Sequence, residues 1–320
     1  MLIFYNKRNK KGFTLIELLV ATVVGIIVLS ALINTYMGVK RSYKEYKDKT
    51  TTESKELLVK NFLYDFIKDV GFACNFGSLN QTYYDSTSDS LDNFFYNSAM
   101  IQVGQLPLTT SNHAAKSLEE GCSGNCFKAG TDYIMIKKEE NSVYLTQINS
   151  SSSELHTTSV EDISVGDYLF LCNKKYINLV KATSINSGSN IVDLSRAPQG
   201  GDYYPGDYVG KYSLQILYIR DSGVVDDNGQ KIFSLYVYIK SNDSDCRNDL
   251  DVDYIPKDGC GVFELVRGVS DLHVEYATVS NGNVTWNSVS TDVDVSTSNY
   301  PSLKVSFDLD GQAFHKIINL

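Results

Sequence analysis

The sequence predicts an α+β protein in which one long N-terminal α-helix packs on an antiparallel β-sheet head with a loop-rich insertion. Residues 13–33 are apolar at nearly every position, and an amphipathic stretch follows to residue 70. Short segments rich in β-branched and aromatic residues then alternate with turn residues through the rest of the chain. The first half of the helix is expected to be transmembrane, because about 20 apolar residues in a helix cross the core of a bilayer.

Residues 1–12 form a cationic leader. Its basic residues are Lys7, Arg8, Lys10 and Lys11. A basic flank stays in the cytoplasm, so the chain beyond the apolar segment is expected outside the inner membrane. An ordinary signal peptide is cut after its apolar region, whereas here the small residue Gly12 precedes it. Cleavage after Gly12 would leave the hydrophobic helix on the mature chain, which would begin at Phe13.

Glu17 is the one carboxylate within this apolar segment. An isolated acid inside a membrane span is costly and needs a partner. After cleavage, the new α-amino group of Phe13 would be an opposite charge at the right depth, and on a neighbouring copy of the helix it could neutralise Glu17. The alternative interpretation is an uncleaved membrane anchor that carries an unpaired Glu17.

The segment from Lys11 to Glu17, Lys-Gly-Phe-Thr-Leu-Ile-Glu, resembles the class III signal of type IV pilins and pseudopilins. This resemblance implies a pilin-like fold, cleavage after Gly12 by a prepilin peptidase, and N-methylation of Phe13. It also implies that the helix packs in a filament core, with Glu17 facing the N-terminus of a neighbouring subunit.

The chain is expected to divide into four segments. Residues 1–12 are the cleaved leader, and residues 13–37 are the transmembrane or filament-core helix. Residues 38–73 continue this helix with amphipathic character, and residues 74–320 form a β-rich head in the periplasm or outside the cell. The second half of the helix should lie on the head, because its apolar residues recur at the spacing of one helix face. The residues of this expected stripe are Leu58, Phe62, Leu63, Phe66, Ile67 and Val70.

Within the head, residues 75–130 are expected to be an irregular insertion, and the rest to be strands. Two strands at 132–138 and 142–148 are predicted to form a hairpin around residues 139–141, because Glu-Glu-Asn suits a turn. A second hairpin is predicted around the Asn-Gly pair in residues 221–229. The other expected strands are 166–172, 177–185, 208–219, 231–239, 262–266, 272–279, 302–308 and 313–318.

Five segments of the chain resemble PilW-type minor pilins in their order. They are Gly71–Cys74, with Ala73 where the family has glycine, Gly130–Lys137, Val165–Cys172, Leu217–Asp221 and Glu264–His273. The resemblance implies a structural protein that helps to initiate or cap a type IV pilus with other minor pilins and the major pilin. It would sit in the inner membrane as a single-pass protein, and then in the pilus, at its tip. A J-type-like pseudopilin of a type II secretion pseudopilus and a pilus-tip adhesin are the alternatives.

The six cysteines predict disulfides, because an even number in an exported domain favours pairing. Cys246 and Cys260 enclose one polar loop and form the predicted pair. The remaining four can pair in three ways; they are Cys74, Cys122, Cys126 and Cys172. A zinc site at Cys122 and Cys126 is disfavoured, because no second ligand pair of the same kind follows.

The sequence predicts no cofactor, no metal and no catalysis. An acidic loop could chelate calcium, but the twelve-residue calcium-loop pattern is absent, so a solvated loop is expected. The calcium candidates in this loop are Asp249, Asp251 and Asp253, beside Asp243 and Asp245. The four histidines show no partner spacing, and neither a nucleophile elbow nor a glycine-rich phosphate loop occurs. They are His113, His156, His273 and His315.

The charge balance argues against a nucleic-acid partner. The net charge is −9, with 29 basic and 38 acidic residues. Loss of the leader would remove four basic residues and leave 25 basic against 38 acidic ones. Nucleic-acid binding depends on an excess of Lys and Arg. The partners that the resemblance implies are the prepilin peptidase, the inner membrane, other minor pilins and the major pilin.

Overall fold

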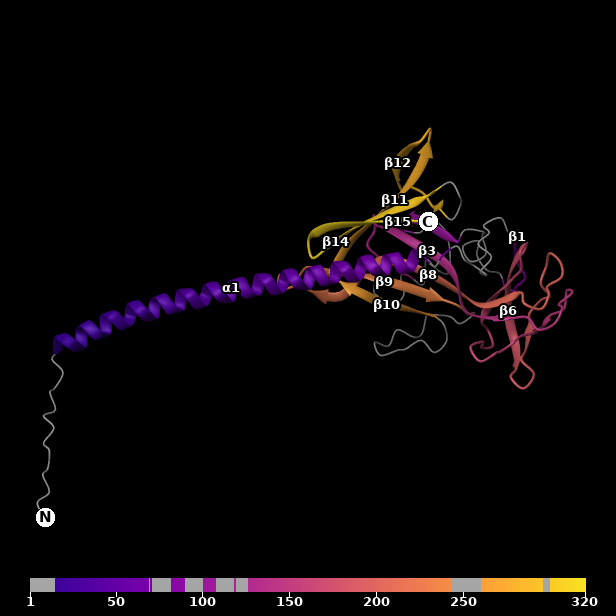
Figure 1. The fold of residues 1–320 in the computed structure, drawn as a ribbon, viewed down its shortest axis with the longest axis horizontal. Coiled ribbons are helices and arrows are strands. Elements are labelled where there is room, and N and C mark those ends of the chain that lie inside the picture. The colour runs from indigo at the N-terminus through magenta and orange to yellow at the C-terminus, as the bar shows by residue number, and fades with distance from the viewer. Residues whose placement is uncertain are drawn as a thin grey trace, which may run out of the picture. The chain divides into compact units, whose positions relative to one another are not determined.

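The computed structural model describes residues 15–68, 70, 82–89, 100–107, 118, 126–242, 260–295 and 300–320. Residues 1–54 and 55–320 form two separate compact units. One helix, α1 (Leu15–Lys68), extends from the first unit into the second (Figure 1). The strands are β1 (Thr82–Asp85), β2 (Ile101–Gln105), β3 (Asp132–Tyr144), β4 (Glu154–His156), β5 (Tyr168–Cys172), β6 (Tyr176–Asn186), β7 (Ile191–Leu194), β8 (Tyr208–Val225), β9 (Lys231–Lys240), β10 (Cys260–Arg267), β11 (Val269–Ser280), β12 (Asn283–Ser288), β13 (Val293–Asp294), β14 (Ser302–Leu309) and β15 (Gln312–Asn319).

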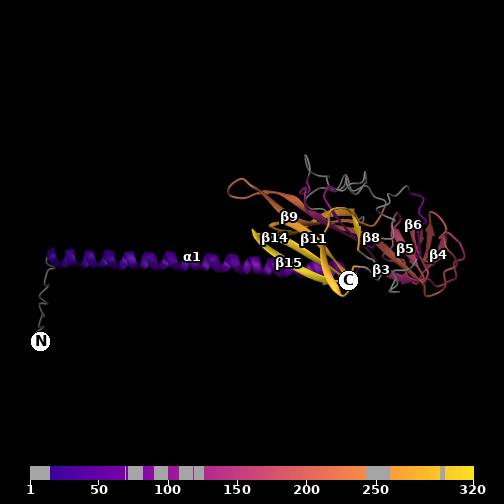
Figure 2. The same ribbon diagram turned by 90° about the horizontal axis from the view of Figure 1, so that it is seen from above.

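The strands form two sheets, which confirms an N-terminal helix followed by a large antiparallel β-sheet head. The larger sheet is built around β8, which pairs with β3 along one edge and with β5 and then β9 along the other. The smaller sheet has the order β12-β11-β14-β15. Among the described pairs, only β1 with β6 is parallel. The strands β4, β5 and β6 lie at the end of the head opposite β14 and β15 (Figure 2).

The part of α1 within the head unit packs on the main core through an aliphatic row. Val59, Leu63 and Ile67 are almost completely buried, and Phe66 and Val70 flank them. The predicted stripe is therefore confirmed at Leu63, Phe66, Ile67 and Val70 but not at Leu58, which is 55% exposed, and Phe62 is only half-buried. Two adjacent rows of apolar residues on this helix have the same four-residue spacing, and periodicity alone does not choose between them. At the start of the stripe, packing places Val59 inward in place of Leu58.

The register of this helix is tested by a matched pair of substitutions. Leu63→Ala should lower the free energy of unfolding by about 2–5 kcal/mol, since it opens a cavity in the core. Leu58→Ala should change it by about 0.5 kcal/mol or less, since exposed sites contribute little. Urea unfolding of the full chain in detergent measures both. An equal or larger loss at Leu58 would contradict the packing described above.

The predicted hairpin at residues 139–141 is wrong, because β3 runs without interruption through this segment. Asn141 has a φ of +49°, and the register against β8 shifts between Glu140 and Val143. The turn residues therefore form a β-bulge. The reason is the length of β8, which spans 18 residues and supplies a pairing edge to both halves of β3. A bulge keeps both halves on this edge, whereas a hairpin would remove one of them.

The other hairpins follow turn chemistry. The β8–β9 hairpin is confirmed, although β8 extends to Val225 and the turn is shorter than predicted. Asp226 Oδ1 accepts hydrogen bonds from the backbone nitrogens of Asn228 and Gln230 at 2.9 and 2.8 Å. The β14–β15 hairpin is also confirmed. Sequence analysis missed the β11–β12 hairpin, whose turn contains Asn281 and Gly282 with φ of +50° and +79°.

The segment predicted as an irregular insertion contains two strands among its described residues, β1 and β2. β2 pairs with β3, and its Val103 is completely buried. β1 pairs with β6. These strands are short and surrounded by Ser, Asn, Asp and Gly, so their local composition predicts loops. They form because neighbouring strands provide pairing edges and because a core covers their side chains.

Two clusters of buried side chains form the interior of the head. The main core extends from α1 to both sheets. A second, smaller core lies around β5, β6 and β7 and includes Leu155, Leu169, Val180 and Val192. Six tyrosines are completely or nearly completely buried; they are Tyr133, Tyr168, Tyr203, Tyr212, Tyr218 and Tyr238. The rings of Phe170 and Tyr212 pack edge to face, with their centroids 4.9 Å apart, which is a favoured aromatic geometry.

A lysine side chain is completely buried in the larger sheet. Lys137 lies on β3, and its backbone nitrogen donates to the Met100 carbonyl. Burial lowers the pKa of Lys137 to about 7, while the charge of Asp294 has the opposite effect. Burial has this effect because a buried ammonium loses its hydration, and the neutral amine is the main form in the folded state above about pH 7.

Lys137 should make the stability of the head depend on pH. Because its pKa is lower in the folded than in the unfolded chain, the unfolded chain binds more protons between about pH 7 and 10. The free energy of unfolding should therefore rise with pH in this window, by up to about 1.4 kcal/mol per unit. Urea unfolding of wild type and Lys137→Met isolates the effect. The free energy of unfolding of wild type minus that of the variant should rise with pH. Parallel pH profiles would exclude it.

Candidate functional site

The first half of α1 exposes apolar side chains around most of its circumference, among the side chains that the structure describes. Successive residues of a helix are about 100° apart around its axis, so a nearly continuous apolar run covers more than one face. Their exposed fractions range from 48% to 83%. These residues are Leu15, Ile16, Leu18, Leu19, Val20, Val23, Val24, Ile26, Leu29 and Ile33. A helix that is hydrophobic all round is normally buried in protein or lipid. This segment therefore requires a covering that its own helix cannot provide.

Three of the predicted site residues belong to this region. Glu17 lies near the start of α1, but its side chain is outside the described residues. Gly12 and Phe13 also lie outside them. Within the described part of the chain, no helix combines the length and the apolar character that a membrane span requires. The transmembrane first half therefore stays a prediction.

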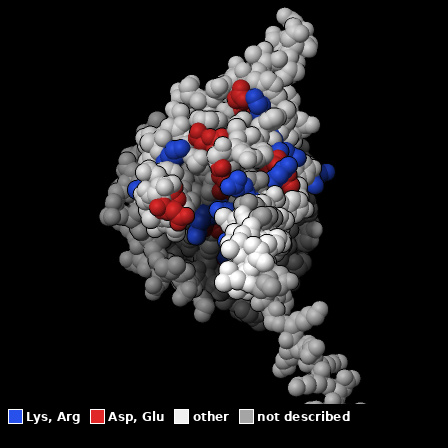
Figure 3. Space-filling model, turned by 90° about the vertical axis from the view of Figure 1, so that its left-hand side faces the viewer, with Lys and Arg blue, Asp and Glu red and all other residues white. Residues whose placement is uncertain are grey.

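Charged contacts tie the second half of α1 to the head. Lys55 Nζ lies 2.9 Å from Asp310 Oδ2 in the β14–β15 turn. Tyr64 lies between two ammonium groups, with Lys68 Nζ at 5.4 Å and Lys316 Nζ at 5.5 Å from its ring centroid. Such cation–π contacts add about 0.5–1 kcal/mol each at exposed sites. On the face shown in Figure 3, basic and acidic side chains are interspersed.

The contact of Asp310 with the helix requires a glycine beside it. Gly268, between β10 and β11, has a φ of +94°, and a Cβ there would lie 2.2 Å from Asp310 Oδ1. The Gly268 carbonyl accepts a hydrogen bond from the Asp310 nitrogen at 3.0 Å. This close approach joins the turn of the smaller sheet to the larger sheet, and Lys55 connects both to the helix.

The acidic and cysteine sites are only partly within the described residues. The calcium candidates Asp249, Asp251 and Asp253 lie outside them, as do Cys74, Cys122 and Cys246 and the side chain of Cys260. Cys126 and Cys172 are both disulfide-bonded. The Cys246–Cys260 pair stays a prediction. In the described ranges, no group of three or more His, Cys, Asp and Glu side chains could hold a metal ion.

A histidine and two aspartates meet at β11, which the sequence spacing did not reveal. His273 Nε2 lies 3.3 Å from Asp271 Oδ2, and its Nδ1 lies 3.8 Å from Asp132 Oδ2. Burial raises the pKa of Asp132, although the hydrogen bond from the Val274 nitrogen opposes this. Asp132 is 142 residues away from Val274 in the chain. The hydrogen bond joins β3 to β11, which supports a structural role for this aspartate.

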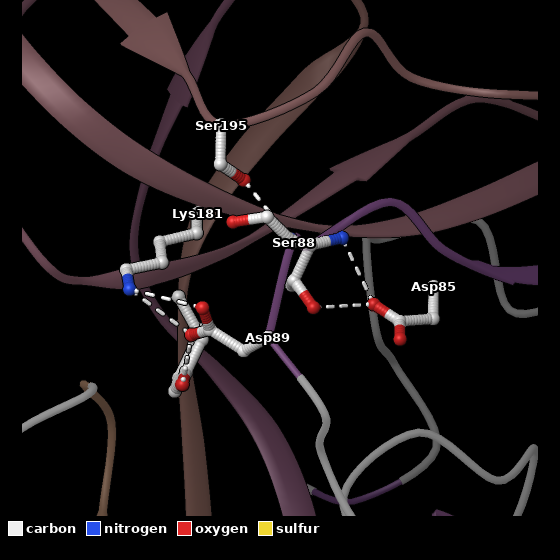
Figure 4. Close-up of polar contacts among 7 residues, drawn as sticks. Asp85, Ser88, Asp89, Lys181 and Ser195 are labelled. Carbon is white, nitrogen blue, oxygen red and sulfur yellow. Dashed lines mark hydrogen bonds and ion pairs between the residues drawn. The ribbon is translucent and has the colours of Figure 1, made fainter.

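A second polar cluster, shown in Figure 4, holds the segment that follows β1. Asp89 accepts hydrogen bonds from Lys181 Nζ at 3.0 and 3.2 Å and from the Tyr168 hydroxyl at 2.8 Å. Asp85 Oδ1 accepts from the nitrogen and hydroxyl of Thr87 at 2.9 and 2.7 Å. Both carboxylates therefore have hydrogen-bond partners within the protein. The cluster fastens the segment to β5 and β6, so it is a structural clamp.

Comparison with known families identifies the first part of the chain. The prokaryotic N-terminal methylation motif matches residues 7–33. The motif indicates a type IV pilin-like or pseudopilin protein. This class III signal implies that the pilin-like chain is processed by prepilin peptidase and assembles with other pilins. It also suggests membrane anchoring followed by a place on the pilus surface. No curated protein matches the chain.

The matched residues coincide with the apolar helix surface. The motif includes Leu15 to Ile33 of α1, where the described apolar side chains are exposed around most of the helix. In a pilin-like protein this surface has two successive environments, the lipid bilayer and the packed helices of a filament. Both meet the requirement for a covering. The pilin-like interpretation therefore accounts for the feature of α1 that the chain alone leaves unexplained.

Proposed function

We propose that this chain is a minor pilin of the PilW type that helps to initiate or cap a type IV pilus. The proposal rests on one observation. The helix that contains most of the methylation motif, residues 7–33, continues into a second half that packs on a β-sheet head. A subunit of this design presents the apolar half of its helix to a filament and carries the β-sheet head outside the filament core. Its role is structural, and it needs neither a cofactor nor a catalytic residue.

In this proposal the prepilin peptidase removes residues 1–12 and leaves Phe13 at the N-terminus, where it is methylated. Residues 13–37 then hold the protein in the inner membrane, with the head in the periplasm, until other minor pilins and the major pilin recruit it. Helix packing replaces lipid contacts during this step. The hydrophobic effect contributes little to this exchange, since lipid is as apolar as the partner helices. Close helix packing and specific polar contacts therefore drive recruitment.

Glu17 is the proposed polar contact, paired with the α-amino group of Phe13 on a neighbouring subunit. Glu17→Val should insert into the membrane normally, since valine is favoured there and a carboxylate is not. It should nevertheless join the complex of minor pilins poorly. Co-purification from membranes with an epitope-tagged partner pilin measures this, with Thr22→Val as a control in the same helix. If the Glu17 variant co-purifies as well as wild type, the pairing does not contribute to assembly.

The size of the head favours a position at the end of a filament. Residues 75–320 comprise 246 residues, for which compact-domain scaling gives a radius of gyration of about 18 Å. Helices in a filament core pack about 8–10 Å apart. A compact sphere with this radius of gyration is about 45 Å across. Heads of this diameter cannot repeat closely along such a core without splaying outward. At the tip, where one side has no neighbour, the constraint is absent.

A deletion strain tests the proposed function. Loss of the protein should abolish or strongly reduce surface pili, seen by electron microscopy, and the wild-type gene should restore them. Normal pili with a secretion defect would assign the chain to a secretion pseudopilus. Normal pili that no longer adhere would make it a tip adhesin. Either result would contradict the assembly role.

The proposed position is tested in the restored strain with an epitope tag on the head. Gold-labelled antibody should mark few sites on each sheared filament, at one end. Gold spread evenly along the shaft would mean that the protein is an ordinary building block. That result would contradict the argument from head size but not the presence of the protein in pili.

A further inference from the structure

An open groove lies at the end of the head formed by β5 and β6. One wall is the turn between these strands, residues 173–176, and the other is the loop of residues 200–207. The groove has a volume of about 540 Å³, within the range of about 300–1,000 Å³ that is usual for small-ligand sites. Neither the proposed pilin function nor the clamp around Asp89 uses these residues.

The turn that forms the first wall is fixed by an asparagine. Asn173 Oδ1 accepts hydrogen bonds from the backbone nitrogens of Lys175 and Tyr176, both at 2.8 Å. Its Nδ2 donates to the Asp202 carbonyl at 3.3 Å, which connects the two walls. Such side-chain contacts to backbone groups stabilise a turn without a regular element. The groove is therefore preformed.

The opposite loop is equally well fixed. The Tyr204 nitrogen donates to Asp207 Oδ2 at 2.7 Å across the Pro205–Gly206 turn, where Gly206 has a φ of +93°. At its base, Gly200 lies so close to two tyrosine rings that a Cβ there would be 2.7 Å from Tyr84 and 2.9 Å from Tyr176. The Tyr176 ring is thus held in place at the edge of the groove, whereas the Tyr204 side chain is 53% exposed.

Several polar groups that line the groove are available to a ligand. Lys174, Lys175 and Asp202 are exposed, and within the described structure their side chains form no hydrogen bond or ion pair. The hydroxyl groups of Tyr176 and Tyr204 can both donate and accept. The lysines donate and the carboxylate accepts. The groove therefore combines aromatic rings with hydrogen-bonding groups of both kinds.

We propose that this groove binds a saccharide. The ring of Tyr204 would contact the apolar C–H face of a sugar, Asp202 would accept hydrogen bonds from its hydroxyl groups, and Lys174 and Lys175 would donate to its oxygens. A sugar combines an apolar face with hydroxyl groups that both donate and accept, which matches the groups that line this groove. A simple anion is a poorer match, because Asp202 and Asp207 line the same groove as the lysines. The inference does not depend on a role in pilus assembly.

The test uses the full chain, purified in a zwitterionic detergent, because detergents with a sugar headgroup would compete. Saturation-transfer NMR is recorded with methyl glycosides of glucose, galactose, mannose, N-acetylglucosamine and N-acetylgalactosamine. At least one should receive saturation on its ring protons and bind in a titration. Tyr204→Ala and Asp202→Ala should each weaken that binding at least tenfold, while Tyr204→Phe retains the aromatic ring and most of the affinity.

Matched controls separate the groove from general effects. Tyr43→Ala and Asp227→Ala remove an exposed tyrosine and an exposed aspartate elsewhere, and both should bind as wild type does. Circular dichroism confirms that each variant folds. Absence of transfer to every glycoside would overturn the proposal, as would binding that neither Tyr204→Ala nor Asp202→Ala weakens. Binding of inorganic phosphate alone, lost in Lys174→Ala, would assign the groove to anions instead.

Discussion

The structure depends on one constraint, which is that the apolar surface of the first half of α1 must be covered by something other than α1. Ten described apolar side chains between Leu15 and Ile33 are exposed, around most of the helix. Exposed patches of this kind on soluble proteins mark sites of protein or membrane interaction. The methylation motif, which covers the same residues, supplies the biological context for that covering. Lipid and partner helices are both chemically suitable.

The same helix meets a different requirement in its second half. From Lys55 onward the buried side chains of the described helix lie in one stripe, and the contacts of Lys55 and Tyr64 lie outside it. The change from a broad apolar surface to a single stripe distinguishes the two halves of the helix. In the proposed function, one half is adapted to an environment that changes during assembly, and the other to a core that does not.

The sequence predicted the N-terminal helix, the antiparallel β-sheet head and the pilin-like N-terminal motif, because these depend on local signals. The apolar segment, the cationic leader and Gly12 are contiguous, so no tertiary information is needed to find them. The strands with clear turn chemistry at Asn228-Gly229 and Asp310-Gly311 were also found. The errors lie where neighbours decide the outcome. Glu139 to Asn141 look like a turn locally, yet the long edge of β8 holds them in a bulged strand.

The remaining sites could not be predicted for the same physical reason. The contacts of Asp132 with the backbone of Val274, of Asp89 with Lys181, and of Asn173 with the Asp202 carbonyl join residues that are distant in the chain. Composition and spacing carry no signal for such pairs. Leu58 is a smaller error of this type, since Leu58 and Val59 begin two rows of the same period and only the shape of the core selects Val59.

The central claim is that this chain is matured and used as a pilin-like subunit, and mass spectrometry of the protein purified from its own cells tests it most directly. The account predicts an N-terminal peptide that begins at Phe13 and carries one methyl group on the α-amino nitrogen. The intact mass should correspond to loss of residues 1–12. A chain that retains Met1 and the cationic leader in membranes and filaments would contradict the account.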